Sequence, residues 1–186
     1  MEAKRIVMLG PPASGKGTQG IRLAAALGVP HVSSGRLLRD SIAAGDPYGI
    51  HALVDSGRRV PDEMVEALLV PAVGEGFVLD GYPRTARQAE RLDQFLAAKG
   101  VPLDAAVELS VPDDALEERM ALRAESEMRT DDQPDVFLRR MEDYRREIPG
   151  LRSHFDARLV SVDAAGSPDE VFERLLAALG AARRRP

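Results

Sequence analysis

The chain has 186 residues, of which 44% are hydrophobic and 30% are charged, and its net charge is −5. This length and composition predict one globular domain with one core, and the negative charge disfavours a general nucleic-acid-binding surface. There is no cysteine, which excludes disulfides, cysteine zinc sites and thiol nucleophiles. No apolar run reaches the roughly 18 residues of a membrane span, and the first residues lead directly into a strand rather than a secretory leader. We therefore expect a cytoplasmic protein that does not enter a membrane.

The elements alternate between strands and helices along the chain. Apolar runs predict strands over residues 5–9, 29–32, 77–80, 105–111 and 158–162, and amphipathic stretches predict helices over 16–27, 37–44, 49–56, 61–73, 85–98, from 112 onward, 134–147 and 168–179. Nearly continuous apolar strands predict an α/β fold of three layers, in which helices cover both faces of a parallel five-stranded sheet. Ligands of such sheets bind at the carboxyl ends of the strands.

The first strand ends in GPPASGKGTQ, residues 10–19, which nearly matches the phosphate-loop motif G-x-x-x-x-G-K-[ST]. The match fails at the last position, because Gly17 follows Lys16 and the hydroxyl of Thr18 comes one place late. Backbone N–H groups of such a loop converge on an anion, and the following helix adds partial positive charge. A tight strand-to-helix turn without a ligand is the alternative. The strand, lysine and helix together favour phosphate binding.

The segment G-K-G-T-Q, residues 15–19, resembles the loop of nucleoside monophosphate kinases, and specifically that of the adenylate kinase family. Residues 33–39 (SSGRLLR) resemble that family's S-T-G-D-x-L-R, and residues 80–88 (DGYPRTARQ) resemble D-G-[FY]-P-R-x-x-x-Q. Residues 129–132 (RTDD) with Arg140 resemble its second arginine pair. These motifs follow the family's order along almost the whole chain, so together they are far more specific than any one of them.

The resemblance implies a fold of the P-loop nucleoside triphosphate hydrolase type, with residues 1–186 as a single kinase domain. Within it, the resemblance places a small helical lobe that binds the nucleoside monophosphate at residues 33–60 and a short lid at residues 123–132. The implied reaction is reversible phosphoryl transfer from ATP to AMP, which gives two ADP. Mg²⁺ is the implied cofactor, and the implied protein is a monomer.

The same resemblance assigns residues to three roles. The catalytic residues are Lys16, Arg84, Arg119, Arg123, Arg129 and Arg140. The ATP-binding residues are Ala13, Ser14, Gly15, Lys16, Gly17, Thr18, Arg119, Arg123 and Gly166. The AMP-binding residues are Ser34, Arg39, Arg58, Arg59, Val60, Gly81, Tyr82, Pro83, Arg84, Gln88, Arg129 and Arg140.

The arginines suit this chemistry because transfer between two nucleotides gathers many negative oxygens in one place. Arg119 and Arg123 are four residues apart, which places both on one face of a helix. Each arginine taken alone is better explained by a solvated surface ion pair, because the chain has 22 arginines. Only the match to the motifs favours the catalytic interpretation.

A magnesium site is predicted from Asp80, which ends an apolar strand, and from the hydroxyl of Thr18. A carboxylate in that position holds Mg²⁺ through water in phosphate-loop enzymes. The alternative is that the Asp80-Gly81 pair only forms a turn.

AMP is favoured by Ser34 and Gln88. An amide offers a donor and an acceptor that suit adenine, whereas relatives acting on UMP and CMP tend to carry Ala and Asn at these positions. A UMP/CMP kinase and a catalytically weak nucleotide-binding relative remain the alternatives. A GTPase switch is excluded, because the chain has no asparagine for the guanine-reading N-K-x-D motif.

Three residues depart from the family pattern. Ala13 stands at a usual glycine, Arg36 at a usual aspartate and Arg59 at a usual leucine. Ala13 is expected to bring a methyl group close to the phosphates, and Arg36 either to contact a phosphate or to point outward. The lid has almost no insertion and the chain has no cysteine, so structural zinc is excluded.

Overall fold

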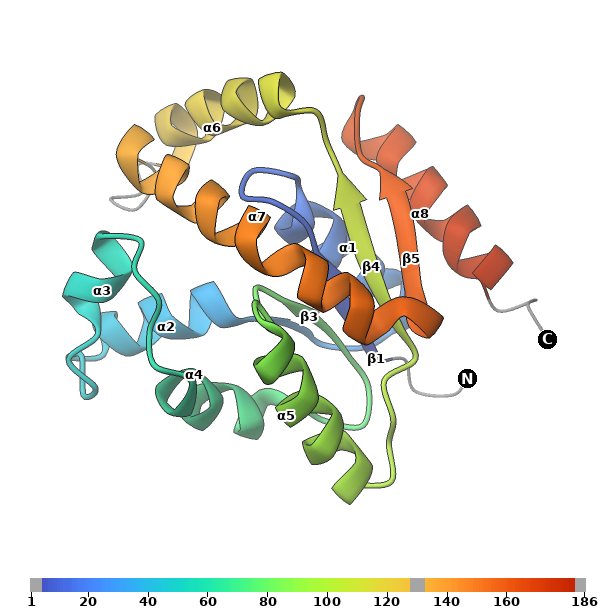
Figure 1. Cartoon of the computed structure of the whole chain (residues 1–186), viewed down its shortest axis with the longest axis horizontal. Coiled ribbons are helices and arrows are strands. Elements are labelled where there is room, and N and C mark those ends of the chain that lie inside the picture. The colour runs from blue at the N-terminus through green and yellow to red at the C-terminus, as the bar shows by residue number, and fades with distance from the viewer. Residues whose placement is uncertain (1–4, 128–132, 183–186) are drawn as a thin grey trace.

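The computed structural model describes the backbone of residues 5–127 and 133–182 and the side chains of residues 5–120 and 133–182. Its centre is a parallel five-stranded sheet in the order β2-β3-β1-β4-β5 (Figure 1), which confirms the predicted sheet. The strands are β1 (Arg5–Leu9), β2 (His31–Ser33), β3 (Phe77–Asp80), β4 (Ala105–Ser110) and β5 (Leu159–Asp163). Because β1 is central, the loop that follows it lies at the middle of the carboxyl edge.

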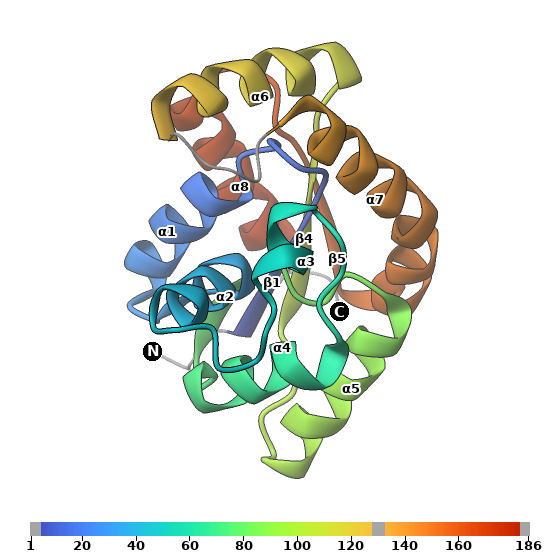
Figure 2. The same cartoon turned by 90° about the vertical axis from the view of Figure 1, so that its left-hand side faces the viewer.

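The helices are α1 (Lys16–Leu27), α2 (Ser34–Ala43), α3 (His51–Asp55), α4 (Asp62–Leu69), α5 (Ala86–Ala98), α6 (Asp113–Glu127), α7 (Pro134–Phe155) and α8 (Pro168–Ala182). Alternate residues of β1 face opposite sides: Ile6 and Met8 pack with α1 and α8, whereas Val7 and Leu9 pack with α4, α5 and α7. Helices therefore cover both faces of the sheet (Figure 2), which confirms the three-layer fold.

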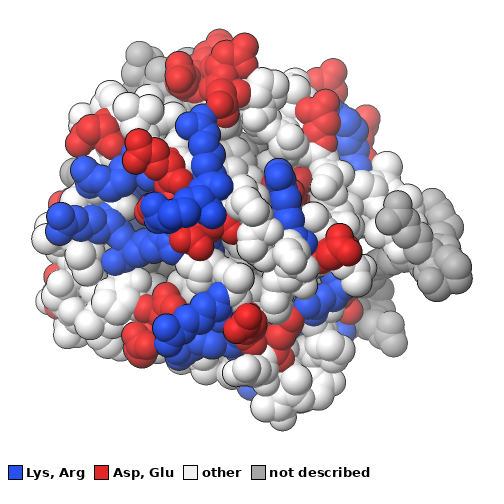
Figure 3. Space-filling model, viewed as in Figure 1, with Lys and Arg blue, Asp and Glu red and all other residues white. Residues whose placement is uncertain are grey.

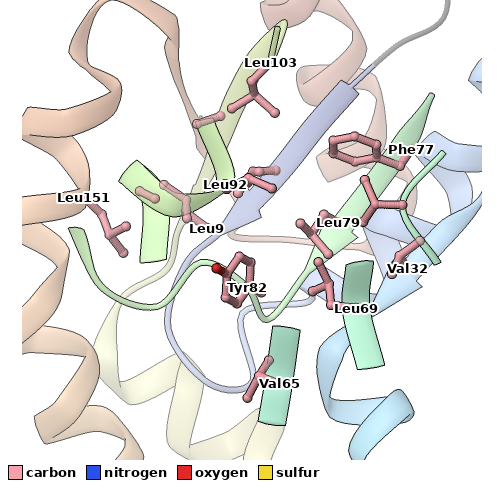
Figure 4. Packing of buried hydrophobic residues seen from close by; sticks show 14 of the residues in the cluster. Leu9, Val32, Val65, Leu69, Phe77, Leu79, Tyr82, Leu92, Leu103 and Leu151 are labelled. Carbon is pink, nitrogen blue, oxygen red and sulfur yellow. The ribbon is translucent and has the colours of Figure 1, made fainter. Parts of the chain in front are cut away.

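The core on the α4, α5 and α7 side extends under the loop after β3. Tyr82, which is 2% exposed, lies there among apolar side chains that include Val65 and Leu69 of α4 and Leu79 of β3 (Figure 4). Burial and a hydrogen bond to Glu66 raise the pKa of Tyr82 above its ordinary value. The phenol therefore remains a hydrogen-bond donor, and it ties this loop to α4.

The predicted end of the helix at residue 147 is wrong, because α7 continues through Pro149 to Phe155. A proline inside a helix costs about 3 kcal/mol, which is why the sequence indicated a stop. Ile148, Leu151 and Phe155 are buried in the core, and each buried side chain of this kind contributes about 1.5–3 kcal/mol. Burial therefore outweighs the proline.

Two other boundaries differ for local reasons. Helix α2 begins at Ser34 rather than residue 37, because Ser33 caps it by accepting a hydrogen bond from the Arg36 N–H. Helix α4 ends at Leu69, and residues 70–72 form a 3₁₀ turn that contains Pro71.

On the face seen in Figure 3, basic side chains gather over α3 and α7 with acidic side chains between them. Arg59 and Arg146 both pair with Asp143 and Glu147. Among the described residues, no helix has the length and apolar character needed to cross a membrane.

Candidate active site

A cleft of about 970 Å³ opens at the carboxyl edge of the sheet, where the loops after β1 and β3 and the start of α2 meet the middle of α7. It gathers nearly all the residues predicted from the motifs. The predicted residues that line it are Ala13, Ser14, Gly15, Lys16, Gly17, Thr18, Ser34, Arg39, Arg58, Arg59, Val60, Asp80, Gly81, Tyr82, Pro83, Arg84, Gln88, Arg119, Arg140 and Gly166. Arg129, with the rest of residues 128–132 of the predicted lid, lies outside the described residues, as does the side chain of Arg123.

The loop after β1 wraps around the ammonium group of Lys16. Its Nζ donates to the carbonyl oxygens of Gly10 and Pro11 at 2.8 and 2.7 Å. Gly15 precedes α1 in a left-handed conformation, and no side chain caps the helix. The N–H groups of the first turn of α1 and a lysine charge therefore share one end of the cleft, which is the arrangement that binds phosphate.

Gly10 is required by this loop. Its φ is +141°, and a Cβ there would lie 2.9 Å from both the Leu109 carbonyl oxygen and the Ser14 hydroxyl. Any side chain would push the loop away from β4, so the glycine permits the close approach.

Ala13 adopts a left-handed conformation with φ of +62°, which explains why a glycine is usual at this position. The residue is buried in a small apolar cluster with Leu116 of α6 and with Phe137 and Met141 of α7. The Ala13 methyl group therefore packs toward these two helices. Packing of the methyl offsets the conformational cost, which is about 1 kcal/mol.

Asp80 lies beside the start of α1. It is paired in register with Met8 of β1 and with Ser33 of β2. If Gly17 carried a Cβ, that atom would lie 3.7 Å from one of the Asp80 carboxylate oxygens. That is an ordinary contact distance, so space alone does not require glycine at position 17. The carboxylate and the exposed Thr18 both line the cleft next to Lys16.

Three of the arginines that line the cleft are predicted catalytic residues, and they come from different elements. Arg119 of α6 donates to the carbonyl oxygens of Ala164 at 2.8 Å and of Ser14 at 3.4 Å, so it bridges the loop after β1 and the turn that contains Gly166. Arg84 donates to the Gly81 carbonyl oxygen at 2.7 Å, and Arg140 lines the cleft from α7. Positive charge thus surrounds the centre of the cleft.

The opposite end of the cleft is formed by α2 and the loop after β3. Gly81 has a φ of +80°, and a Cβ there would lie 2.6 Å from the hydroxyl of Ser34. The Ser34 hydroxyl is buried and has no hydrogen-bond partner among the described residues. Arg39 packs close to Gly35 on the same helix.

Both the nitrogen and the oxygen of the Gln88 side-chain amide form hydrogen bonds. Its Nε2 donates to Asp62 Oδ1 and its Oε1 accepts from the Arg84 N–H, each at 2.6 Å. Thr85 caps α5 by accepting from the Gln88 N–H at 3.1 Å, and Gln88 itself is 4% exposed. The amide is therefore placed rigidly in the wall of the cleft.

The two charged departures from the family pattern behave differently. The Arg59 guanidinium pairs with Glu147 at 3.1 Å and Asp143 at 3.6 Å, and so ties the segment after α3 to α7. Arg36 lines the cleft with an exposed side chain. Burial lowers the pKa of His31, the charge of Asp80 opposes that effect and the charge of Arg36 adds to it.

The motifs missed an ionic cluster built on a buried carboxylate, that of Glu108. Glu108 of β4 is 3% exposed, accepts from the Tyr144 hydroxyl at 2.9 Å and pairs with Arg152 at 2.8 Å. Tyr144 is one helical turn after Arg140, so the cluster anchors α7 where it faces the cleft. A single carboxylate inside the apolar strand AAVELS is the signal that the sequence offered.

No group of three or more histidine, cysteine, aspartate or glutamate side chains suited to a metal occurs among the described residues. One carboxylate and one hydroxyl nonetheless fit Mg²⁺, which keeps several waters and takes its other ligands from substrate phosphates.

Comparison with known proteins extends the likeness over nearly the whole chain. The family model described as adenylate kinase matches residues 8–160. The chain is 46% identical over 183 residues to an adenylate kinase of Mycobacterium sp. (strain MCS) and to one of Nocardia farcinica (strain IFM 10152). It is 45% identical over 185 residues to that of Xanthomonas euvesicatoria pv. vesicatoria (strain 85-10). Each alignment covers 95% of this chain and 99% of the relative.

Proposed function

This chain belongs to the adenylate kinase family, and we propose that its cleft holds ATP at the loop of residues 10–19 and AMP between α2 and Gln88. It is a phosphotransferase that moves a phosphoryl group from ATP to AMP, giving two ADP. The assignment of an ATP end and an AMP end rests on one observation. The cleft is lined by Lys16, Arg84, Arg119 and Arg140.

Lys16 is proposed to bind the terminal phosphates of ATP. Its ammonium group already lies in the mouth of the loop, held by two carbonyl oxygens. An incoming phosphate meets this charge together with the N–H groups at the start of α1, so little rearrangement is needed to stabilise the negative oxygens.

The arginines are proposed to complete the phosphate site from three directions. Arg119 contacts the ATP side, Arg84 the monophosphate side, and Arg140 the transferred group between them. Arg123 and Arg129 belong to the same proposal through the family motif. Guanidinium groups suit this role because they remain charged and bind phosphate with two parallel donors.

Mg²⁺ bound with ATP is proposed to be held by Asp80 through water and by the Thr18 hydroxyl. When bound, the cation neutralises charge on the phosphates. Asp80 is positioned for this by the register between β3 and β1, and its carboxylate lies beside Gly17 at the start of α1.

The remaining site assignments follow the same division. We propose that residues 33–60 form the segment that binds the monophosphate, with Arg39, Arg58, Arg59 and Val60 along its wall, and that residues 123–132 form a short lid. Ala13, Ser14, Gly15, Gly17 and Gly166 belong to the ATP end; Ser34, Gly81, Tyr82 and Pro83 belong to the AMP end. We further propose a cytoplasmic monomer that needs no zinc and binds neither nucleic acid nor membranes.

A panel of monophosphates tests the substrate assignment. With MgATP as donor, AMP is expected to be phosphorylated with a higher kcat/KM than CMP, UMP or GMP, as measured by coupled ADP production. A preference for CMP or UMP would contradict the AMP end of the proposal, and no turnover with any of them would indicate a catalytically weak relative.

Replacing Asp80 with asparagine tests the metal assignment. We expect Asp80→Asn to raise the Mg²⁺ concentration needed for half-maximal rate and to lower kcat about tenfold or more, because one carboxylate charge is lost. Glu75→Gln is the matched control, since Glu75 is exposed and precedes the opposite end of β3. An unchanged magnesium dependence in Asp80→Asn would remove Asp80 from the metal site.

A further inference from the structure

We propose that Asp62, the first residue of α4, determines which bases the monophosphate site accepts, by fixing the orientation of the Gln88 amide. This inference rests on the proposed function, in which Gln88 faces the base of AMP. The observation behind it is that two partly buried hydrogen bonds of 2.6 Å hold the amide, one to Asp62 and one from the Arg84 N–H.

The two partners of Gln88 leave the amide only one orientation. The Asp62 carboxylate can only accept hydrogen bonds and the Arg84 N–H can only donate one. Turning the amide over would place its oxygen against the carboxylate and its NH₂ group against the Arg84 N–H. With Gln88 4% exposed, water is largely excluded from repairing either mismatch.

The backbone around Gln88 is fixed as firmly as its side chain. Thr85 accepts from the Gln88 N–H at 3.1 Å, and the Tyr82 hydroxyl lies 3.2 Å from the Gln88 carbonyl oxygen. The same hydroxyl donates to Glu66 at 2.9 Å, so α4 and α5 are tied together on both sides of the amide. Rotation of the amide about its last torsion is therefore the movement that Asp62 must prevent.

The orientation of the amide decides which base edge it complements. The bonds to Asp62 and Arg84 leave Gln88 one N–H donor and one oxygen lone pair. Adenine presents an amino group beside a ring nitrogen acceptor, which matches an oxygen and an N–H held in a fixed order. A 6-oxopurine presents an acceptor beside a ring N–H, which is the reverse order. The fixed amide therefore selects amino bases over oxo bases, whereas the choice between purine and pyrimidine depends on other parts of the cleft.

The test compares AMP with IMP, which differ only in replacing the 6-amino group and N1 acceptor by a 6-oxo group and an N1–H. Asp62→Asn keeps the size of the side chain but can donate or accept toward Gln88, so only the Arg84 N–H still opposes turning of the amide. We expect the ratio of kcat/KM for AMP over IMP to fall about tenfold or more, with kcat/KM for IMP rising in absolute terms. If the role of Asp62 were merely structural, its replacement would lower kcat/KM for both AMP and IMP and would not raise kcat/KM for IMP.

Glu63→Gln is the matched control, because it removes the adjacent negative charge from a side chain that is 69% exposed. Its AMP:IMP ratio and the KM for ATP are expected to match the unmodified protein. Asp62→Ser, whose hydroxyl also donates and accepts, is the second variant if the asparagine variant does not fold. An unchanged AMP:IMP ratio in a folded Asp62 variant would overturn the inference.

Gln88→Leu separates this inference from the proposed function beneath it. If Gln88 contacts the base, this variant loses the preference for AMP over IMP, whether or not Asp62 orients the amide. If Gln88→Leu retains the preference for AMP over IMP, Gln88 does not contact the base, and the proposed role of Asp62 is also wrong. If Gln88→Leu loses the preference but Asp62→Asn keeps it, Gln88 reads the base and Asp62 does not orient it.

Discussion

Replacing Lys16 with methionine is expected to lower kcat for ADP formation from ATP and AMP by about 10³-fold or more. Methionine has a similar length but no charge, so it cannot stabilise the negative oxygens of the transferred phosphoryl group. Lys16→Arg is expected to be nearly as defective, because the compact ammonium fits between the Gly10 and Pro11 carbonyl oxygens at 2.8 and 2.7 Å and a planar guanidinium does not.

Lys99→Met is the control for this change. Lys99 is exposed and its ammonium lies over the ring of Phe95, away from the cleft. Its removal is expected to leave kcat unchanged. Urea unfolding of both variants checks that Lys16→Met remains folded. A folded Lys16→Met protein with normal turnover would show that the loop after β1 does not bind the reacting phosphates.

The phosphate loop illustrates what local sequence can predict. The apolar strand, the glycines and the lysine each have a local conformational or chemical requirement, so residues 5–27 indicated strand, loop and helix with the bounds that the structure has for β1 and α1. The direction of the Ala13 methyl could not be predicted in this way. It depends on Leu116, Phe137 and Met141, which lie more than 100 residues further along the chain.

The end of α7 shows the opposite case, in which a strong local signal is overridden. The helix was predicted to end at residue 147, two residues before Pro149, but Leu151 and Phe155 are buried against the sheet and hold the helix together beyond that point. Local propensity competes here with a larger burial term, and only the tertiary structure shows which of them dominates.

Polar contacts within the site were the least predictable part. The motifs identified Gln88 and Arg59 but not their partners, Asp62 for the first and Asp143 with Glu147 for the second. Aspartate and glutamate are common on helix surfaces, so none of these acidic residues is distinctive in the sequence. Their significance arises from the way α4 and α7 pack beside the segments that carry the motifs.

Gly81→Ala is expected to damage the monophosphate end of the cleft selectively. The new Cβ would lie 2.6 Å from the Ser34 hydroxyl, which is buried on α2 and has little room to move. The φ of +80° adds about 1 kcal/mol of strain for any residue with a side chain. The loop after β3 and the start of α2 must therefore separate, and we expect KM for AMP to rise about tenfold or more while KM for ATP stays within about twofold.

A second substitution divides this effect into its two causes. Ser34→Ala in the Gly81→Ala background removes the hydroxyl that the new Cβ would meet, but it leaves the left-handed conformation unchanged. Partial recovery of KM for AMP in the double variant, measured against Ser34→Ala alone, is expected if contact between α2 and the loop shapes the site. If the double variant recovers nothing, backbone strain at residue 81 accounts for the damage; if ATP binding weakens as much as AMP binding, the separation of the cleft into two ends is wrong.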